Sequence, residues 1–549
     1  MLFAFKKKKK SPWLTYSVLL LGLPLSFAAQ AVNEHEQQLR ESERAIQQKI
    51  EENRYQQLSP HSPSGITSEE IPLSEACLPL NGLQLSGISL LKEQDLAGLS
   101  PIPADCISDS NVNRLIREIT QRYLDKGYIT ARAVFAPLDE NNTLRLHWVE
   151  GVLEAIESED HTIALDYLFP NLIGKPLNIR DLDQGLDQLN RLQSHHATLD
   201  ILPATQFGGS IVRLRNQTKS PYRVTLSLDN YASRQHGRLQ GQLGFSIDNL
   251  TGRADFLALS YGQPLTKKAE NNNRTYSALY LIPYGYWTAS LFASQAESAT
   301  RLPLSGARYQ GASRQLGFRL DRVLNRHQTH IITLSSGLSH KRSQSELLGY
   351  RHPDQNLRLS IAELNLDYLK LIGEHTINVN IGVQRGLGIF GATKATSEHL
   401  TEPHFNKWSL NVNWHYPINT LRFHHQIVAQ YSPQRLPSVE TLELTGRNSV
   451  RGFDSFSFSG DSGWLLRNNI SYPIHYRTLQ LSPYAGLDTG RLFNRHGNNA
   501  WQSAVGTSFG IHLRYKQLSG SFSFDRGWFV SSPVRQNESR MLGKITLSF

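Results

Sequence analysis

The sequence predicts a transmembrane β-barrel of 16 antiparallel strands, preceded by two small α/β modules and an N-terminal helix. Residues 218–549 divide into segments in which apolar and polar side chains alternate. This two-residue period is typical of a β-strand that has an apolar environment on one face and a polar environment on the other. The gaps between the segments are alternately short and long, as in bacterial outer-membrane barrels. An export signal opens the chain, but no later apolar run reaches the roughly 20 residues of a membrane-spanning helix. Strands closed into a barrel are the other structure that satisfies its backbone in lipid.

Residues 1–31 have the three parts of a secretory signal peptide. Lys6 to Lys10 form the basic region, an apolar core follows, and Ala29-Gln30-Ala31 is a small-residue cleavage site. A membrane anchor is the alternative, but the apolar core is short and is broken by Gly22 and Pro24. The sequence therefore predicts an exported protein.

Composition argues against nucleic-acid binding and against metal or redox chemistry. Removal of the signal takes away five lysines and leaves 52 basic against 47 acidic residues, a mild excess over a long chain. Cys77 and Cys106 are the two cysteines, and in an exported protein they are expected to form one disulfide, with two buried thiols as the alternative. Neither belongs to a CxxC motif, and His195-His196, expected in a surface turn, lacks an ordered set of metal ligands. We therefore expect no metal and no cofactor.

Residues 32–57 are predicted to form a long polar helix. They are rich in Glu, Gln, Arg and Lys, with a narrow apolar stripe that has little to bury in a protein core. At about 1.5 Å per residue the helix would be about as long as a bilayer is thick, so it could plug a water-filled pore. A solvated leader helix is the alternative. Residues 58–73, rich in Pro, Ser and Glu, are predicted to be a linker.

Two consecutive modules of about 70 residues share the order strand, helix, strand, strand. In the first, residues 74–150, apolar residues recur at helical spacing from Val112 to Tyr123 and two alternating strands follow. In the second, residues 151–217, a leucine-rich helix precedes two strands that are separated by Gly208-Gly209.

The barrel is predicted to have an even number of strands, as bacterial barrels do. Its strands are expected at residues 221–231, 238–249, 253–264, 274–283, 287–297, 312–324, 328–340, 357–371, 374–386, 405–417, 420–431, 462–473, 478–489, 501–516, 518–528 and 538–549. Gaps after even-numbered strands are short and are assigned to the periplasmic side, and the long gaps are assigned to the outside. A soluble β-sandwich or propeller is the alternative, but no blade repeat is visible and more than 300 residues of such strands are long for a sandwich.

The sixth long loop, residues 433–461, carries the run Val450-Arg451-Gly452-Phe453. In the strand at 478–489, Asp488 shares a face with polar residues, whereas leucines occupy the opposite face. If the leucines meet lipid, Asp488 faces the lumen and can accept a bidentate guanidinium. We hypothesise that the loop folds inward and that Arg451 pairs with Asp488. The alternative is an exposed turn with a solvated arginine.

These features together resemble the outer-membrane transporters of two-partner secretion, the TpsB family, which belongs to the BamA-related superfamily. The run at 450–453 is similar to the family motif VRG[YF], and Leu487-Asp488-Thr489-Gly490 is similar to its x-D-x-G strand motif. The resemblance implies that the two modules are POTRA domains, 74–150 and 151–217, and that Arg451 pairs with Asp488. It also implies a loop–lumen lock made of Val450, Arg451, Gly452, Phe453, Asp488 and Gly490.

The resemblance further implies that the partner is a secreted TpsA-type exoprotein: an adhesin, a haemolysin or a contact-dependent inhibition toxin. The POTRA domains would capture it unfolded in the periplasm, and the barrel would pass it to the cell surface. A monomer in outer-membrane lipid, inserted by the barrel-assembly machinery, is expected. A BamA-like insertase is the alternative function. An enzyme is not expected, since neither a G-x-S-x-G nor an HExxH motif is present.

Overall fold

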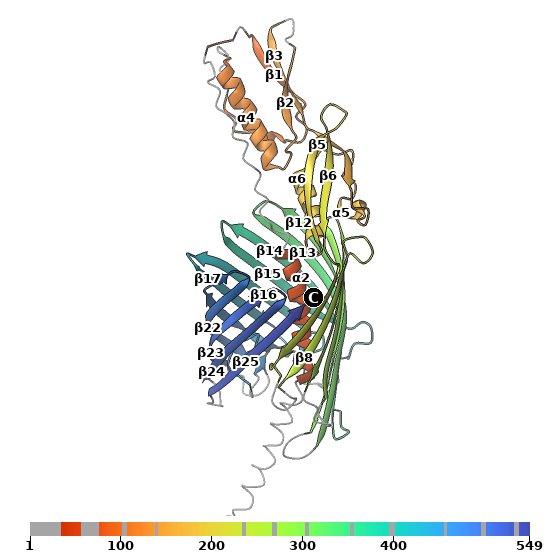
Figure 1. Cartoon of the computed structure of the whole chain (residues 1–549), viewed down its shortest axis with the longest axis vertical. Coiled ribbons are helices and arrows are strands. Elements are labelled where there is room, and N and C mark those ends of the chain that lie inside the picture. The colour runs from red at the N-terminus through yellow and green to blue at the C-terminus, as the bar shows by residue number, and fades with distance from the viewer. Residues whose placement is uncertain are drawn as a thin grey trace, which may run out of the picture.

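The computed structural model describes residues 34–55, 76–78, 80–101, 107–137, 141–232, 238–265, 272–301, 307–351, 356–394, 401–454, 458–495, 501–531 and 537–549. The predicted signal peptide (1–31), the linker (58–73) and Cys106 lie outside these residues. Figure 1 shows two small domains stacked end to end on one end of a barrel, with a helix inside the barrel.

The first module is a three-stranded mixed sheet covered by a helix. Its elements are β1 (Gly82–Ser86), α3 (Glu93–Leu96), α4 (Asp109–Asp125), β2 (Arg132–Ala136) and β3 (Thr143–Val149), with strand order β1-β3-β2. The Ser108 hydroxyl caps the start of α4 by accepting the amide hydrogen of Asn111, and Ile119 and Tyr123 on its buried face pack with Trp148. The module therefore has its own hydrophobic core.

The second module repeats this plan. It contains β4 (Val152–Ser158), α5 (Leu165–Leu168), α6 (Ile179–Asn190), β5 (His195–Pro203) and β6 (Gly209–Thr218), with strand order β4-β6-β5. The prediction that His195 lies in a surface turn is wrong. His195 begins β5, is 9% exposed and has its Nδ1 2.9 Å from Asn216 Nδ2, because the strand starts earlier than the alternation of apolar residues indicated.

Sixteen antiparallel strands close into the barrel, as predicted. They are β7 (Tyr222–Asp229), β8 (Gln240–Asp248), β9 (Phe256–Pro264), β10 (Asn272–Tyr284), β11 (Trp287–Arg301), β12 (Arg308–Arg326), β13 (His330–Leu347), β14 (Arg358–Ile372), β15 (His375–Leu387), β16 (Asn406–Ile418), β17 (Leu421–Tyr431), β20 (Ser462–Ser471) continued by β21 (Ile474–Tyr476), β22 (Leu479–Phe493), β23 (Trp501–Tyr515), β24 (Leu518–Ser531) and β25 (Asn537–Ser548). Proline donates no backbone hydrogen bond, and Pro473 interrupts the twelfth strand, so that β20 and β21 both pair with β22. Pairing of β25 with β7 closes the barrel, with Leu547 opposite Leu226.

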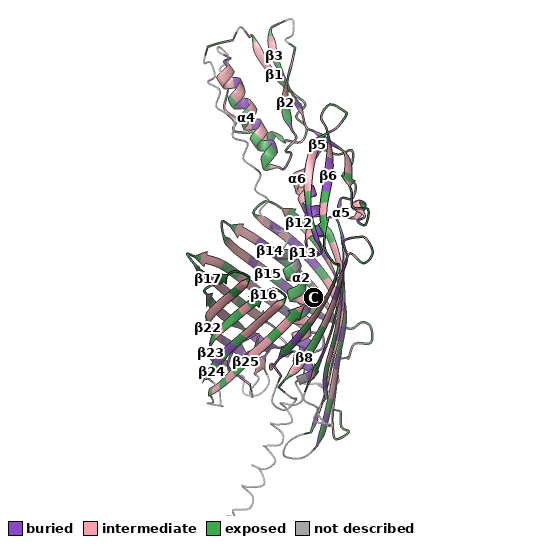
Figure 2. Cartoon of the chain, in the orientation of Figure 1, coloured by how far each residue is buried: buried purple, intermediate pink, exposed green. Residues whose placement is uncertain are grey.

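The barrel wall has the inverse of the burial pattern of a soluble protein. Large apolar side chains face outward, such as Leu316, Phe318 and Phe522, whereas Ser335 and Asp488 are fully buried inside. In Figure 2 exposed and buried residues alternate along the strands. An apolar exterior around a polar interior is the arrangement of a membrane-spanning barrel.

Helix α2 (Glu34–Tyr55) occupies the lumen, between the barrel walls in Figure 1. Its 22 residues span about 33 Å. In the described residues, no helix is both long enough and apolar enough to cross a membrane. The long loop between β17 and β20 contains a 3-10 turn, η2 (Ser438–Glu440), and a two-stranded ribbon of β18 (Leu442–Glu443) and β19 (Ser459–Gly460).

Candidate functional site

Arg451 lies inside the barrel and contacts Asp488 on β22. Its Nε and Nη2 atoms donate to the two carboxylate oxygens at 2.6 Å each, and its backbone N–H donates to the same carboxylate at 3.1 Å. Nη1 donates to Asn469 Oδ1 at 2.9 Å. Asp488 is 0% exposed and Arg451 7%. This is the bidentate geometry in which guanidinium–carboxylate pairs are strongest.

Glycines of the barrel wall make room for the loop tip. Gly506 lies directly opposite Asp488, and Gly527 lies directly opposite Gly506 on the next strand. A β-carbon on Gly506 would collide with the carbonyl oxygen of Arg451, and one on Gly527 would collide with the ring of Phe453. Gly452 has a φ of +102° and meets the β24 backbone, so a side chain there would be strained and would clash.

An apolar cluster holds the loop beside the ion pair. Val450 is fully buried, and the ring of Phe453 lies 4.5 Å from that of Phe529. A β-carbon on Gly490 would collide with Leu465 and would crowd Leu444 of the loop. The structure thus brings all six residues of the predicted loop–lumen lock to one wall, formed by β20 and β22 to β24.

Helix α2 and the loop are joined by a buried carboxylate. Glu443 accepts hydrogen bonds from Arg40 (2.8 Å from Nη2) and from Arg44 (3.3 Å from Nη1), both on the helix. Glu443 is 2% exposed. Arg40 also donates to the backbone carbonyl of Ser438. One loop carboxylate therefore contacts two helix cations.

A second buried charge network includes the barrel wall. Glu440 of the loop contacts Lys341 Nζ of β13 at 2.6 Å and Lys407 Nζ of β16 at 2.5 Å. Lys341 also lies 2.5 Å from Glu43 of the helix. Lys341 therefore has a carboxylate from the helix and one from the loop, so the two lumen elements share a wall residue.

The C-terminal part of the helix packs on the wall of β9 to β12. Ile46 and Ile50 join an apolar cluster with Leu281 and other barrel residues, and Gln47 accepts a hydrogen bond from Arg319 at 2.9 Å. The His35 end of α2 lies near the extracellular side, where Tyr309 contacts it. The helix thus runs from the extracellular side to the periplasmic side, where the POTRA-like modules lie.

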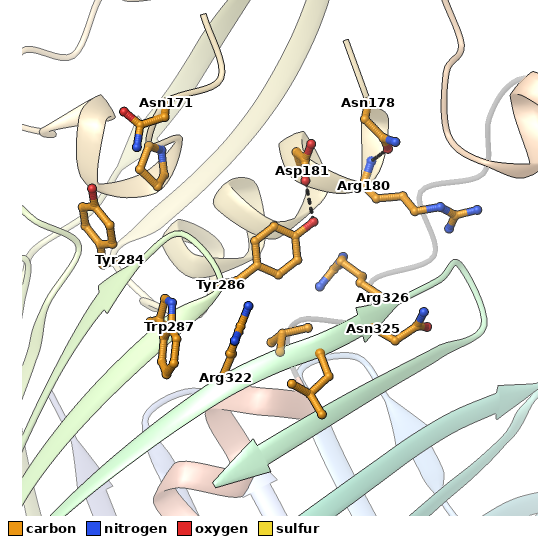
Figure 3. Close-up of a pocket in the computed structure, with 13 residues that line it drawn as sticks. Asn171, Asn178, Arg180, Asp181, Tyr284, Tyr286, Trp287, Arg322, Asn325 and Arg326 are labelled. Carbon is orange, nitrogen blue, oxygen red and sulfur yellow. Dashed lines mark hydrogen bonds between the residues drawn. The ribbon is translucent and has the colours of Figure 1, made fainter. Parts of the chain in front are cut away.

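The second module docks on the short barrel turns. Asp187 of α6 forms an ion pair with Arg326, and Gln184 and Gln188 donate to the carbonyl of Gly285. Figure 3 shows the hydroxyl of Tyr286, in the β10–β11 turn, donating a hydrogen bond to Asp181. Both residues line a cleft of about 470 Å³ between the module and the barrel. Burial raises the pKa of Tyr286, and this hydrogen bond raises it further. The module is therefore fixed at the mouth of the barrel by charge pairs and hydrogen bonds.

In the first module, Glu150 joins β3 to the segment after β1. Its carboxylate accepts the N–H groups of Ser89 and Leu90 at 2.7 Å each and the hydroxyl of Tyr123 at 2.7 Å. Burial would raise the pKa of Glu150, but these hydrogen bonds, together with a stronger one from the Ser89 hydroxyl, outweigh burial and lower it. Cys77 is disulfide-bonded, and its predicted partner Cys106 lies outside the described residues.

Within the residues that the structure describes, no group of three or more His, Cys, Asp or Glu side chains could hold a metal ion. What the lumen offers is a polar passage filled by a helix and a loop, both held by charge pairs.

Comparison with known proteins supports this description. The model of the family "Haemolysin secretion/activation protein ShlB/FhaC/HecB" matches residues 208–513, and two POTRA models match residues 78–151 and 152–203. The chain is 38% identical to the hemolysin transporter protein HpmB of Proteus mirabilis over 85% of each chain. It is 37% identical to the hemolysin transporter protein ShlB of Serratia marcescens over 94% of this chain and 95% of that one. The structure of CdiB from Escherichia coli matches 95% of this chain and 98% of that chain with a TM-score of 0.82 at 24% identity, and so has the same fold.

Sequence reasoning identified the six residues of the loop–lumen lock but missed the wall glycines and the loop carboxylates around it. Gly506 and Gly527 carry a usable signal, because a glycine inside a strand often marks a close approach of another backbone. Glu440 and Glu443 stand in a polar loop, where a carboxylate is ordinarily solvated, so no local pattern marked them.

Proposed function

Since this chain belongs to the haemolysin secretion/activation family ShlB/FhaC/HecB and is an outer-membrane transporter of two-partner secretion, we propose that its cargo is a haemolysin-class exoprotein. The proposal rests on the 37–38% identity to two haemolysin transporters, against 28% to the CdiB transporter of Dickeya dadantii. The cargo would reach the periplasm unfolded and leave through the barrel.

We infer that the POTRA domains capture the cargo as an added strand. β2 is an edge strand of the first module and carries Phe135, which is 59% exposed. An extended segment can pair with such an edge, while its side chains contact the exposed ring. Because the second module is docked on the barrel through Asp187 and Arg326, captured cargo would be delivered at the pore mouth.

We further propose that α2 leaves the lumen during transport, whereas the loop lock keeps the loop on its wall. The observation that carries this proposal is the nature of the contacts. Besides the packing of Ile46 and Ile50 on the wall, helix α2 is held by hydrogen bonds and ion pairs that water can replace, such as those of Arg40 and Arg44 with Glu443. The loop tip adds an apolar anchor, Phe453 against Phe529, to its ion pair. Once the helix has left, the wall would present polar side chains to the moving chain.

Secretion assays test the role of the lock. In Arg451→Ala or Asp488→Ala, one buried charge loses its partner, which costs about 3–5 kcal/mol. We expect the variants to reach the outer membrane but to release less cargo into the medium, with other outer-membrane barrels at normal levels. Arg491→Ala is the matched control, since Arg491 is an exposed arginine stacked on Trp501. Normal secretion by both lock variants would remove the pair from the mechanism.

A further inference from the structure

Three arginines form a row on the outer wall of the barrel. Arg314 of β12 lies directly opposite Arg342 of β13, which lies directly opposite Arg358 of β14. Figure 1 shows these three strands side by side. The β-carbons of directly opposite residues are about 4.5–5.5 Å apart, so three guanidinium groups share a small surface.

The row faces away from the lumen. Side chains alternate along a strand, and Ser313 and Gln315, on either side of Arg314, are buried in the barrel. Leu316 and Phe318, which share the face of Arg314, are 56% and 49% exposed. The arginines therefore stand on the same surface as the apolar side chains that meet lipid.

The row lies at the extracellular edge of the apolar band. Arg326, at the periplasmic end of β12, contacts Asp187 of the second module. Twelve residues separate it from Arg314, about 40 Å along the strand and about 30 Å along the axis of a barrel with ordinary strand tilt. The apolar band of such barrels is about 25 Å tall. This is the depth at which the charged groups of outer-leaflet lipids lie.

Within the described residues, no carboxylate pairs with the row. In the described part of the chain, no hydrogen bond or ion pair involves the guanidinium groups of these three arginines. Two outward carboxylates lie farther up the strands and do not contact the row: Glu346 pairs with Arg351 at 3.4 Å, and Glu297 accepts a hydrogen bond from Gln295, the residue directly opposite Arg314. Like charges placed directly opposite destabilise a sheet, so this row needs an anion from outside the chain.

We propose that the arginine row, Arg314, Arg342 and Arg358, binds the phosphate groups of an outer-leaflet glycolipid of the lipopolysaccharide class. Guanidinium groups bind phosphate oxygens through two parallel hydrogen bonds, and three adjacent arginines match a lipid with more than one phosphate. Immediately above the row is a hollow of about 350 Å³, lined by the amides of Gln310 and Gln344 and by two acidic and two basic side chains, Glu297, Glu346, Arg308 and Arg351. This mixture of hydrogen-bond donors and acceptors suits a sugar headgroup. Leu316 and Phe318 below it would contact the acyl chains.

Binding to the purified full-length protein in detergent tests the proposal, with a diphosphorylated lipid A glycolipid as the probe and native mass spectrometry as the readout. We expect at least tenfold weaker binding by the triple variant Arg314→Gln/Arg342→Gln/Arg358→Gln. A glycolipid that lacks the phosphates should bind equally weakly to the wild type and to the triple variant. Millimolar inorganic phosphate should not displace the intact lipid, because a free ion lacks the acyl contacts.

The matched control is Arg385→Gln/Arg491→Gln/Arg526→Gln, which removes three exposed, outward arginines that are not directly opposite one another. It should bind like the wild type. Thermal unfolding supplies a second readout that does not depend on binding measurements. Without lipid, the row variant should be at least as stable as the wild type, because charge repulsion is gone, and added glycolipid should stabilise the wild type alone. Equal binding by the two triple variants, or equal stabilisation of wild type and row variant, would overturn the proposal.

Discussion

Asp488, Gly506 and Gly527 form one row across three strands, and this row explains the residues at the loop tip. Asp488 binds the guanidinium of Arg451, while the two glycines leave space for the backbone of Arg451 and the ring of Phe453. Close approach requires the absence of β-carbons as much as it requires opposite charges. The loop tip is therefore held in two ways: by the charge of Asp488 and by the groove that Gly506 and Gly527 leave in the wall.

We expect Gly506→Ala to displace the loop tip without disturbing the barrel. The added methyl group would meet the carbonyl oxygen of Arg451, which is main chain and cannot rotate away. Gly543→Ala is the control, because a β-carbon there has no heavy atom within 4 Å. Limited proteolysis of the loop and single-channel recordings would detect the displacement. Equal protection of the loop in both variants would show that the groove does not position it.

Glu150 makes the stability of the first module depend on pH. Its folded-state pKa is lowered, so its contribution is present above the ordinary value of 4.5 and is lost as pH falls through the lowered value. Hydrogen exchange of the β1 and β3 amides in wild type and Glu150→Gln, compared at each pH, measures the effect. We expect the wild type to be better protected at pH 7 and the difference to shrink towards pH 3. A difference that is independent of pH would exclude this origin.

At the scale of elements, α2 and the loop are held by separate carboxylates. Glu443 binds only helix cations, whereas Glu440 binds the wall through Lys341 and Lys407. Loss of Glu443 should therefore loosen the helix more than the loop. The linkage through Lys341, which also contacts Glu43, means that departure of the helix changes the charge balance around Glu440 without removing its partners.

We expect deletion of residues 33–57 to raise ion conductance in planar bilayers while secretion persists, since a wide lumen would lose its plug. Glu443→Gln should raise conductance in the same direction but less, because Ile46 and Ile50 still pack on the wall. Glu346→Gln, which removes a carboxylate paired with Arg351 outside the lumen, is the control. Unchanged conductance after the deletion would contradict the plug role of α2.

The elements were largely predictable, whereas their contacts were not. The alternation of polar and apolar side chains placed Asp488 inward and marked the sixteen strands. The short and long gaps between the strands distinguished the periplasmic side from the extracellular side. The pairing of Arg40 with Glu443 joins residues 403 positions apart in the chain. Such a pair depends on the position that the helix takes inside the closed barrel, and no local sequence pattern encodes that position. His195 shows the reverse case, a local pattern that pointed to a turn although the sheet extends the strand.

At the scale of the whole molecule, the transport path and its plug compete for one space. The second module is fixed to the barrel through Asp187 and Arg326, so the module cannot easily swing aside to admit cargo. The helix, in contrast, has few apolar anchors and could leave towards the side where its C-terminal end lies. Transport by this route therefore requires that α2 moves relative to the wall.

A disulfide between helix and wall tests this requirement. A β-carbon on Gly311 would lie 2.9 Å from Cγ of His35, so cysteines at both positions would bring their sulfurs within bonding range. We expect oxidised His35→Cys/Gly311→Cys to retain low conductance and to leave cargo in the periplasm, and reductant to restore export. Each single-cysteine variant, treated identically, controls for reduction of the native disulfide at Cys77. The single variant His35→Cys loses the same contacts with Tyr309 and Ser343 but forms no cross-link, so it isolates the effect of the bond. Full export by the oxidised double variant would mean that cargo passes with the helix in place.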